Sequence, residues 1–185
     1  MDKVLSLQDI KASELLREIT AGKVFIYPTD TLYGLGCDAT NPEAVMRIRE
    51  IKQRATQPFS VIVPSTRWIY THCHAKRQYV EKLPGPFTFI FRLKKLGILP
   101  SVVTPLDTIG VRIPDHPFTR HLQKARALFV TTSVNVSGTA PITDVRRIPR
   151  RISKAVDYII DAGPLENQPS TIIDLTGEIA RIVRP

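Results

Sequence analysis

Apolar positions along the chain recur at two different spacings, which predicts that helices alternate with strands. Over residues 8–21 the apolar residues recur at helical spacing, and Gly22 is placed to end that helix. Residues 23–27 follow as a short apolar run rich in strand-forming residues, which Pro28 ends. The pattern therefore predicts a helix that leads directly into a strand, followed by a loop.

The same alternation continues to the end of the chain. Asn41 and Pro42 are typical of a helix N-cap and first helical position, and they predict a helix that continues to about Arg54. The remaining expected elements are strands at 59–63, 87–93, 109–113, 127–131, 156–160, 171–174 and 179–183, with helical segments before about Lys82 and over 117–126. Helices between strands indicate an α/β fold, and the closely spaced final strands indicate antiparallel pairing. We therefore expect a single α/β domain over 1–185, a twisted mixed parallel and antiparallel sheet with flanking helices.

Composition limits the classes of protein to which the chain can belong. Of the 185 residues 43% are hydrophobic, which is enough for a sizeable core and unlike a disordered chain. No apolar run reaches the roughly 18 residues that a membrane span needs, and the first residues lack the apolar core of a signal peptide. We therefore expect a cytoplasmic protein without a membrane partner.

The cysteine and histidine residues do not predict a metal site. Cys37 and Cys73 allow at most one disulfide and exclude a four-cysteine zinc site, which favours a reducing compartment. We expect Cys37 to be a small buried residue. His72 and His74 lie two residues apart without a third ligand nearby, which favours packing and surface roles over a metal.

The net charge of +9, from 26 Lys and Arg against 17 Asp and Glu, favours polyanionic partners such as RNA or nucleoside triphosphates. The alternative is a solvated basic surface without a partner. One cluster, Arg146, Arg147, Arg150, Arg151 and Lys154, has the charge to follow an RNA backbone. Because no aromatic residue is interleaved for base stacking, a solvated helical face is the competing interpretation.

Five polar segments interrupt the regular pattern, and each lies at the end of a strand or the start of a helix, where α/β sheets bind ligands. They are residues 27–36, 52–58, 107–114, 133–138 and 170–174. Neither a Walker sequence nor a GxGxxG sequence is present, so the common phosphate-binding loops do not explain them.

Each of these segments, taken alone, has a plain structural alternative. The hydroxyl-rich loop around Thr29 and Thr31 is also typical of a turn that satisfies its own backbone. Lys52 and Arg54 suit an anion, but also a solvated helix end. Arg112 lies within an apolar strand and needs a partner, which is either a ligand or a structural Asp.

Taken together and in order, the segments resemble the YrdC-like threonylcarbamoyl-AMP synthases over nearly the whole chain. The resemblance rests on the loop 27–36, the Lys-x-Arg pair, the sequence PGPFT from Pro84, GVRIPDHP from Gly110, the Ser-x-Asn-x-Ser-Gly turn from Ser133, STIID from Ser170, and the closing Arg184-Pro185. It implies synthesis of threonylcarbamoyl-AMP from L-threonine, bicarbonate and ATP with release of pyrophosphate. The product would serve the modification of a tRNA adenosine beside the anticodon.

The resemblance also implies roles for particular residues. The threonine site would comprise Thr31, Arg112, Thr131 and Ser170, with Arg112 pairing the amino acid's carboxylate. The ATP site would comprise Lys52, Arg54, Gln57, Thr108, Ser133, Asn135 and Arg184. Lys52 and Arg54 would act in catalysis by charge stabilisation, and Mg²⁺ would arrive with ATP rather than on protein ligands. A tRNA threonylcarbamoyl-transferase complex would be the downstream partner, with tRNA itself a further contact.

The sequence departs from the family pattern at three positions. Val134 stands where Ala is usual, Ala55 where Pro follows the Lys-x-Arg pair, and Ile62 where some relatives have His. An alternative function is an RNA-binding module that uses its basic surface without nucleotide turnover. The use of this domain in hydrogenase maturation expects long fused segments with zinc-binding cysteines, which this sequence lacks.

Overall fold

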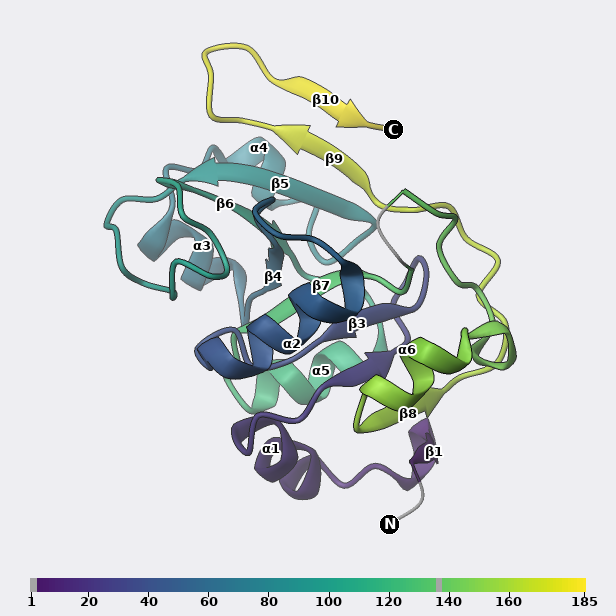
Figure 1. Cartoon of the computed structure of the whole chain (residues 1–185). Coiled ribbons are helices and arrows are strands. Elements are labelled where there is room, and N and C mark those ends of the chain that lie inside the picture. Colours follow the sequence, from purple (N-terminus) through teal and green to yellow (C-terminus); the bar gives the residue numbers. More distant parts are fainter. Residues whose placement is uncertain (1–2, 136–137) are drawn as a thin grey trace.

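The computed structural model describes residues 3–135 and 138–185, and over these residues its strands form one mixed sheet (Figure 1). The strands are β1 (Val4–Ser6), β2 (Phe25–Tyr27), β3 (Gly34–Gly36), β4 (Ser60–Ile62), β5 (Phe87–Arg92), β6 (Thr108–Arg112), β7 (Phe129–Ser133), β8 (Tyr158–Asp161), β9 (Thr171–Asp174) and β10 (Arg181–Arg184). Their order across the sheet is β1-β8-β2-β3-β7-β4-β6-β5-β9-β10. Neighbours in the sheet are thus often distant in sequence.

Both pairing directions occur. β8 pairs parallel with β1 and β2, β4 pairs parallel with β6, and β5 pairs parallel with β9. The remaining neighbours, such as β3 with β7 and β9 with β10, pair antiparallel. The prediction of a mixed sheet within an α/β fold is confirmed.

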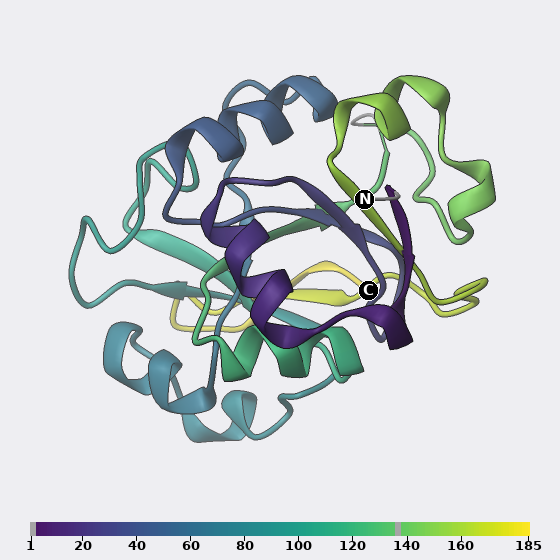
Figure 2. The same cartoon turned by 90° about the horizontal axis from the view of Figure 1, so that it is seen from below.

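Helices flank the sheet on both sides (Figure 2). They are α1 (Ala12–Thr20), α2 (Pro42–Lys52), α3 (Thr66–His72), α4 (Arg77–Val80), α5 (Pro117–Lys124) and α6 (Arg150–Ala155), with 3-10 turns η1 (Leu7–Asp9) and η2 (Val145–Arg147). None of the helices in the described residues has the length and apolar character to cross a membrane.

The sheet separates two apolar clusters because successive side chains of a strand point to opposite faces. On β7, Phe129 joins the cluster under α1 and α5, whereas Val130 joins the larger cluster that includes α2. Two residues beyond Phe129, Thr131 follows on the same face but lines a cavity instead. The face that carries apolar side chains at one end of the strand therefore carries polar ones at the other.

The structure changes several expected boundaries. The helix expected over 8–21 is split into η1 and α1, and the helical segment before Lys82 is two short helices. Asn41 caps α2 as predicted, accepting from the Ala44 amide at 3.1 Å. α2 ends at Lys52 rather than Arg54, because Gln53 has a left-handed backbone with φ 51°. The strand expected over 127–131 is shifted to Phe129–Ser133.

β3 lies inside the segment that the sequence predicted to be a loop. Its residues, Gly34 to Gly36, have low intrinsic strand propensity, and the strand forms because β2 and β7 pair with it on both sides. A Cβ on Gly36 would lie 2.2 Å from the Val130 carbonyl oxygen, so only glycine permits this close approach. β1 and α6 were also not predicted as separate elements.

Candidate active site

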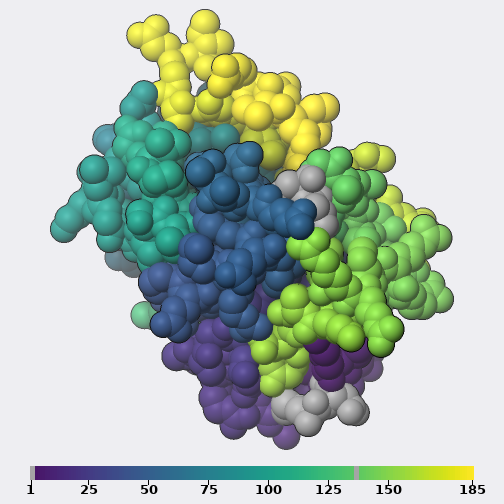
Figure 3. Space-filling view, in the orientation of Figure 1, coloured from purple at the N-terminus to yellow at the C-terminus, as the bar shows by residue number. Residues whose placement is uncertain are grey.

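Two adjoining cavities lie where the loop after β2, the end of α2 and the C-terminal hairpin meet. The first has a volume of about 180 Å³ and is lined by seven of the predicted site residues, Thr31, Arg54, Arg112, Thr131, Ser133, Ser170 and Arg184. The second, of about 260 Å³, is lined by five, Lys52, Arg54, Gln57, Ser133 and Asn135. Because Arg54 and Ser133 line both, the cavities form one continuous site. Figure 3 shows the blue segment around the end of α2 against the yellow C-terminal hairpin.

One predicted ligand, Thr108, lines neither cavity. It begins β6, and its carbonyl oxygen accepts from the Thr104 hydroxyl at 2.8 Å. Val136 and Ser137, part of the turn that the sequence singled out, lie outside the described residues. All other predicted binding residues are brought to the two cavities, although they come from segments throughout the chain.

The end of the site opposite Lys52 is built around Arg112. Its Nη2 donates to Asp30 Oδ1 at 2.7 Å and to the Thr31 hydroxyl at 3.1 Å. Asp30 Oδ2 in turn accepts from the Asp115 amide at 3.0 Å. The partner of Arg112, which the sequence left open, is therefore Asp30. This residue was not among the predicted site residues, although it lies in the polar loop 27–36.

Arg112 is not fully satisfied by these contacts. It is only 8% exposed, and burial lowers the pKa of its guanidinium while Asp30 opposes that shift. Its Nε is buried and has no hydrogen-bond partner in the described residues. A buried N–H without an acceptor is costly, so a ligand carboxylate or other acceptor in the cavity would relieve it.

Hydroxyl groups line the rest of this end of the site. Thr29 and Thr31 share a hydrogen bond of 2.9 Å between their hydroxyls. Thr131 accepts from the phenol of Tyr27 at 2.7 Å, which leaves the Thr131 hydroxyl hydrogen for another acceptor. Tyr27 was not predicted as a site residue. Its ring lies under Gly34, where a Cβ would approach it to 2.6 Å.

The C-terminal hairpin closes the first cavity. Arg184 Nη2 donates to the Ser170 carbonyl oxygen at 2.8 Å and to its hydroxyl at 3.1 Å. Ser170 Oγ also lies 2.9 Å from the hydroxyl of Thr88, a buried residue that sequence reasoning missed as a contact. Thr88 nevertheless belongs to one of the sequence motifs, which is the signal that would have found it.

Lys52 is a buried cation rather than a solvated helix end. It is 2% exposed, and its Nζ donates to the Ser133 carbonyl oxygen at 2.8 Å and to Asn135 Oδ1. Burial first, and the charge of Arg54 second, lower the pKa of Lys52 to about 8. The interpretation of this residue as a surface charge is wrong, because α2 ends inside the molecule.

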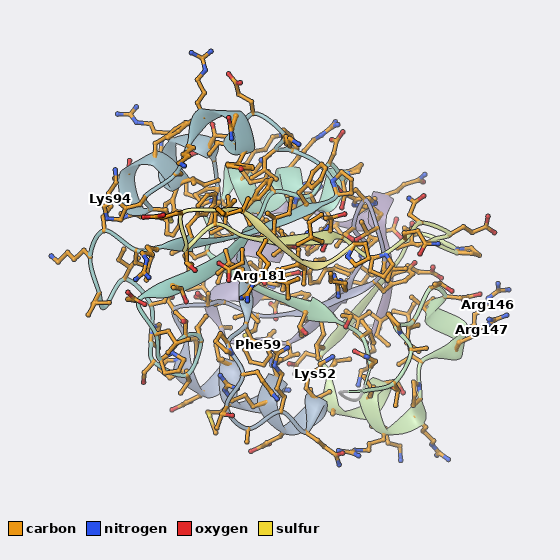
Figure 4. The ribbon with its side chains drawn as sticks, turned by 90° about the horizontal axis from the view of Figure 1, so that it is seen from above. Lys52, Phe59, Lys94, Arg146, Arg147 and Arg181 are labelled. Carbon is orange, nitrogen blue, oxygen red and sulfur yellow. The ribbon has the colours of Figure 1, made fainter. Side chains whose placement is uncertain are left out.

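Arg54 is the cation that both cavities share. Its Nη2 donates to the Pro58 carbonyl oxygen, and its Cζ lies 5.0 Å from the centre of the Phe59 ring. Burial lowers the pKa of its guanidinium, and Arg49 adds to that effect. Figure 4 shows Lys52 and Phe59 near one another in the middle of the molecule.

Two members of the basic cluster at 146–154, Arg146 and Arg147, lie apart from this site. Arg146 and Arg147 project from the edge of the molecule in Figure 4, away from Lys52 and Phe59. Arg146 is paired with Asp144 at 2.6 Å, which lowers the pKa of that carboxyl to about 2. Arg150 and Arg151 begin the short helix α6 and are exposed, as expected for a solvated helical face.

Of the residues considered as metal ligands, the cysteines and His72 pack in the molecule, whereas His74 is exposed. Cys37 and Cys73 are buried free thiols, as expected for Cys37, and His72 lies 4.6 Å from the Trp68 ring. In the described part of the chain, no group of three His, Cys, Asp or Glu side chains could hold a metal ion. The site is thus an array of hydroxyls, amides and cations suited to binding and charge stabilisation.

Comparison with known proteins agrees with this geometry. A model of the Sua5/YciO/YrdC family, described as "Telomere recombination", matches residues 17–185. The chain is 37% identical over 94% of its length to a Methanocaldococcus jannaschii protein provisionally named threonylcarbamoyl-AMP synthase, covering 88% of that protein. It is 32% identical over 92% of its length to the threonylcarbamoyl-AMP synthase of Pseudomonas fluorescens, covering 96% of it.

A solved structure shows the same fold. The Sua5 protein of P. abyssi in complex with L-threonine matches 98% of the chain with a TM-score of 0.85 and 27% identity. The chain spans 57% of the length of that Sua5 protein. With a family model that covers most of the chain and curated relatives above 30% identity, the chain belongs to the Sua5/YciO/YrdC family.

Proposed function

We propose that this chain is a threonylcarbamoyl-AMP synthase, which joins L-threonine, bicarbonate and ATP and releases pyrophosphate. The relatives that carry this name align over more than nine tenths of the chain. The single observation that carries the proposal is the pair of adjoining cavities that share Arg54 and Ser133. One cavity has the groups for an amino acid and the other has the cations for a polyphosphate.

The first cavity is the proposed threonine site. The carboxylate would take the unpartnered Nε of Arg112, and the hydroxyls of Thr31, Thr131 and Ser170 would surround the rest of the amino acid. The bound L-threonine of the P. abyssi Sua5 complex supports this substrate. Because Arg112 is already held by Asp30, its guanidinium is fixed before the ligand arrives.

The second cavity is the proposed site of the triphosphate. Lys52 and Arg54 supply positive charge, and Gln57, Ser133 and Asn135 supply hydroxyl and amide groups to phosphate or ribose oxygens. Arg184 faces the first cavity and would reach the nucleotide from the C-terminal hairpin. Mg²⁺ would enter as the counterion of ATP. The role of Thr108 stays a prediction, because it lies outside both cavities.

The chemistry needs positioning and charge stabilisation more than a protein nucleophile. The amine of threonine and bicarbonate form a carbamate with loss of water. A carbamate oxygen then attacks the α-phosphorus of ATP, and the bond to pyrophosphate breaks. Lys52 and Arg54 would stabilise the negative charge that the leaving pyrophosphate gains. The product would be handed to a tRNA threonylcarbamoyl-transferase complex.

The decisive experiment follows pyrophosphate release from labelled ATP. We expect release only when threonine and bicarbonate are both present, together with a threonylcarbamoyl-adenylate product. Release that persists after rigorous removal of bicarbonate would contradict the mechanism. RNA affinity with a steep salt dependence and no turnover of ATP would instead favour an RNA-binding module.

A further inference from the structure

Arg49 is a buried arginine that the proposed reaction does not use. It lies in α2, three residues before Lys52, and is only 7% exposed. Its Nε donates to the Val102 carbonyl oxygen at 2.9 Å. Its Nη1 lies within hydrogen-bond distance of three further carbonyl oxygens, those of Arg54 at 3.0 Å, Ala55 at 3.1 Å and Gln57 at 3.2 Å. One side chain thus contacts three backbone carbonyls of the loop that follows α2.

The other hydrogen bonds of this loop's backbone lie near its two ends, from the Arg54 amide to the Arg49 carbonyl oxygen at 3.0 Å and from the Phe59 amide to the Val103 carbonyl oxygen at 2.9 Å. The loop lies between the end of α2 and the start of β4, so its carbonyls are outside the regular helix and sheet. Ala55 leaves the backbone freer than the proline usual in relatives would, since proline fixes φ. A guanidinium presents a rigid, planar fork of donors, which holds several acceptors in a fixed arrangement. The hydrogen bonds from Arg49 in α2 therefore hold the backbone of this loop, which lacks a proline at position 55.

Arg49 and Arg54, the residue proposed to bind phosphate, both contact the ring of Phe59. The Cζ atoms of Arg49 and Arg54 lie 4.7 Å and 5.0 Å from the centre of the Phe59 ring. Arg54 also donates to the Pro58 carbonyl oxygen next to that ring. The direction in which Arg54 points is thus set by a loop and a ring that both contact Arg49.

We propose that Arg49 is a positioning residue for the phosphate end of the site, which holds the loop so that Arg54 and Gln57 face the nucleotide. The proposal rests on the proposed function, in which Arg54 binds the triphosphate. A purely structural role for Arg49 would make different demands. It would lower stability and would affect the kinetics toward threonine and ATP alike. A positioning role affects ATP alone, because the residues of the proposed threonine site lie on other elements.

The first test compares steady-state kinetics of Arg49→Met and Arg49→Lys. We expect Arg49→Met to lower kcat/KM for ATP by about 10- to 100-fold, with KM for threonine at saturating ATP unchanged. Arg49→Lys keeps the charge but not the fork, so its loss should be intermediate. If Arg49→Met does not fold, Arg49→Lys carries the test. Equal losses toward threonine and ATP would overturn the proposal.

Arg47→Met is the matched control on the same helix. Arg47 pairs with Asp157 at 2.9 Å and donates to the Ala155 carbonyl oxygen at 3.3 Å, outside both cavities. Its loss should leave kcat/KM for ATP unchanged while it lowers Tm. A loss for ATP as large as that of Arg49→Met would mean that any α2 arginine has this effect, and would overturn the proposal.

A double-mutant cycle separates this inference from the proposed function. In an Arg54→Ala background, Arg49→Met should cause a smaller further loss than it does alone, because only its effect through Gln57 remains. Additive losses would overturn the positioning role alone. Should Arg54→Ala leave kcat/KM for ATP intact, the proposed ligand itself is wrong and the inference falls with it. Hydrogen exchange of the amides at 54–57 gives a readout without activity, and unchanged protection in Arg49→Met would also overturn the proposal.

Discussion

The two ends of the site hold their cations in different ways. Arg112 is paired with the carboxylate of Asp30 at 2.7 Å, and both side chains are about one tenth exposed. Lys52 and Arg54 instead donate hydrogen bonds to neutral oxygens, among them the Ser133 carbonyl and the Pro58 carbonyl. A carboxylate compensates the charge of a guanidinium, whereas a carbonyl satisfies only its hydrogen bonds.

The difference matches the ligand proposed at each end. An amino acid carries one positive and one negative group, so the threonine end needs orientation rather than excess charge. A triphosphate carries several negative charges, which the cations Lys52 and Arg54 would attract and hold. The comparison predicts that changes at the threonine end act on geometry and selectivity, and that changes at the phosphate end act on nucleotide binding.

The largest expected effect concerns amino-acid selectivity at the threonine end. Buried hydroxyls that recognise the substrate hydroxyl would lose a partner when valine binds, whereas serine loses only a methyl contact. We expect kcat/KM for valine to fall by roughly 10⁴-fold relative to threonine, and that for serine by about 10- to 200-fold. Valine and serine reacting equally well would mean that this end recognises shape alone.

The next effect is the loss of the shared cation. Arg54→Ala should lower kcat/KM for ATP by about 10²- to 10³-fold, the size seen when a donor to a developing charge is removed. Steady-state kinetics at varied ATP measure it, with the exposed Arg146→Ala as the control. A rise in KM for threonine as large as the loss for ATP would contradict the assignment of separate substrates to the two ends.

At the threonine end, Asp30→Asn should act on stability. It would leave the buried guanidinium of Arg112 without its charge partner, which costs about 3 kcal/mol of unfolding free energy. Chemical denaturation measures this change, and kinetics should show a higher KM for threonine with KM for ATP unchanged. An unaltered free energy of unfolding would show that Asp30 does not compensate the charge.

The smallest effect is a pH dependence at the phosphate end. With the pKa of Lys52 lowered to about 8, ATP affinity of the free protein should fall above that pH, by about tenfold at one unit higher. Direct binding measurements avoid the titration of bicarbonate, and Lys52→Arg should remove the decline. At pH values between the pKa of Lys52 in the folded protein and its higher pKa in the unfolded chain, the unfolded chain binds more protons than the folded protein. The contribution of Lys52 to the free energy of unfolding therefore rises with pH in this range. Constant ATP affinity across pH 8 would contradict the lowered pKa.

The sequence by itself determined the fold class. Local periodicity sufficed to place α2 after its Asn41 cap, because capping and helical spacing depend on neighbouring residues. Of the binding residues that the motifs predicted, all except Thr108 line the cavities, and their binding roles stay predictions. Caps, helical spacing and motifs need only short-range information.

Only the tertiary structure decided which residues meet across the chain. Arg112 and Asp30 are 82 positions apart, and Tyr27 contacts Thr131 across 104 positions. β3 exists because β2 and β7 flank it, and Lys52 is buried because α2 ends against the loop at Ser133. Such contacts depend on the order of strands in the sheet and on burial, and neither can be obtained from the spacing of residues along the sequence.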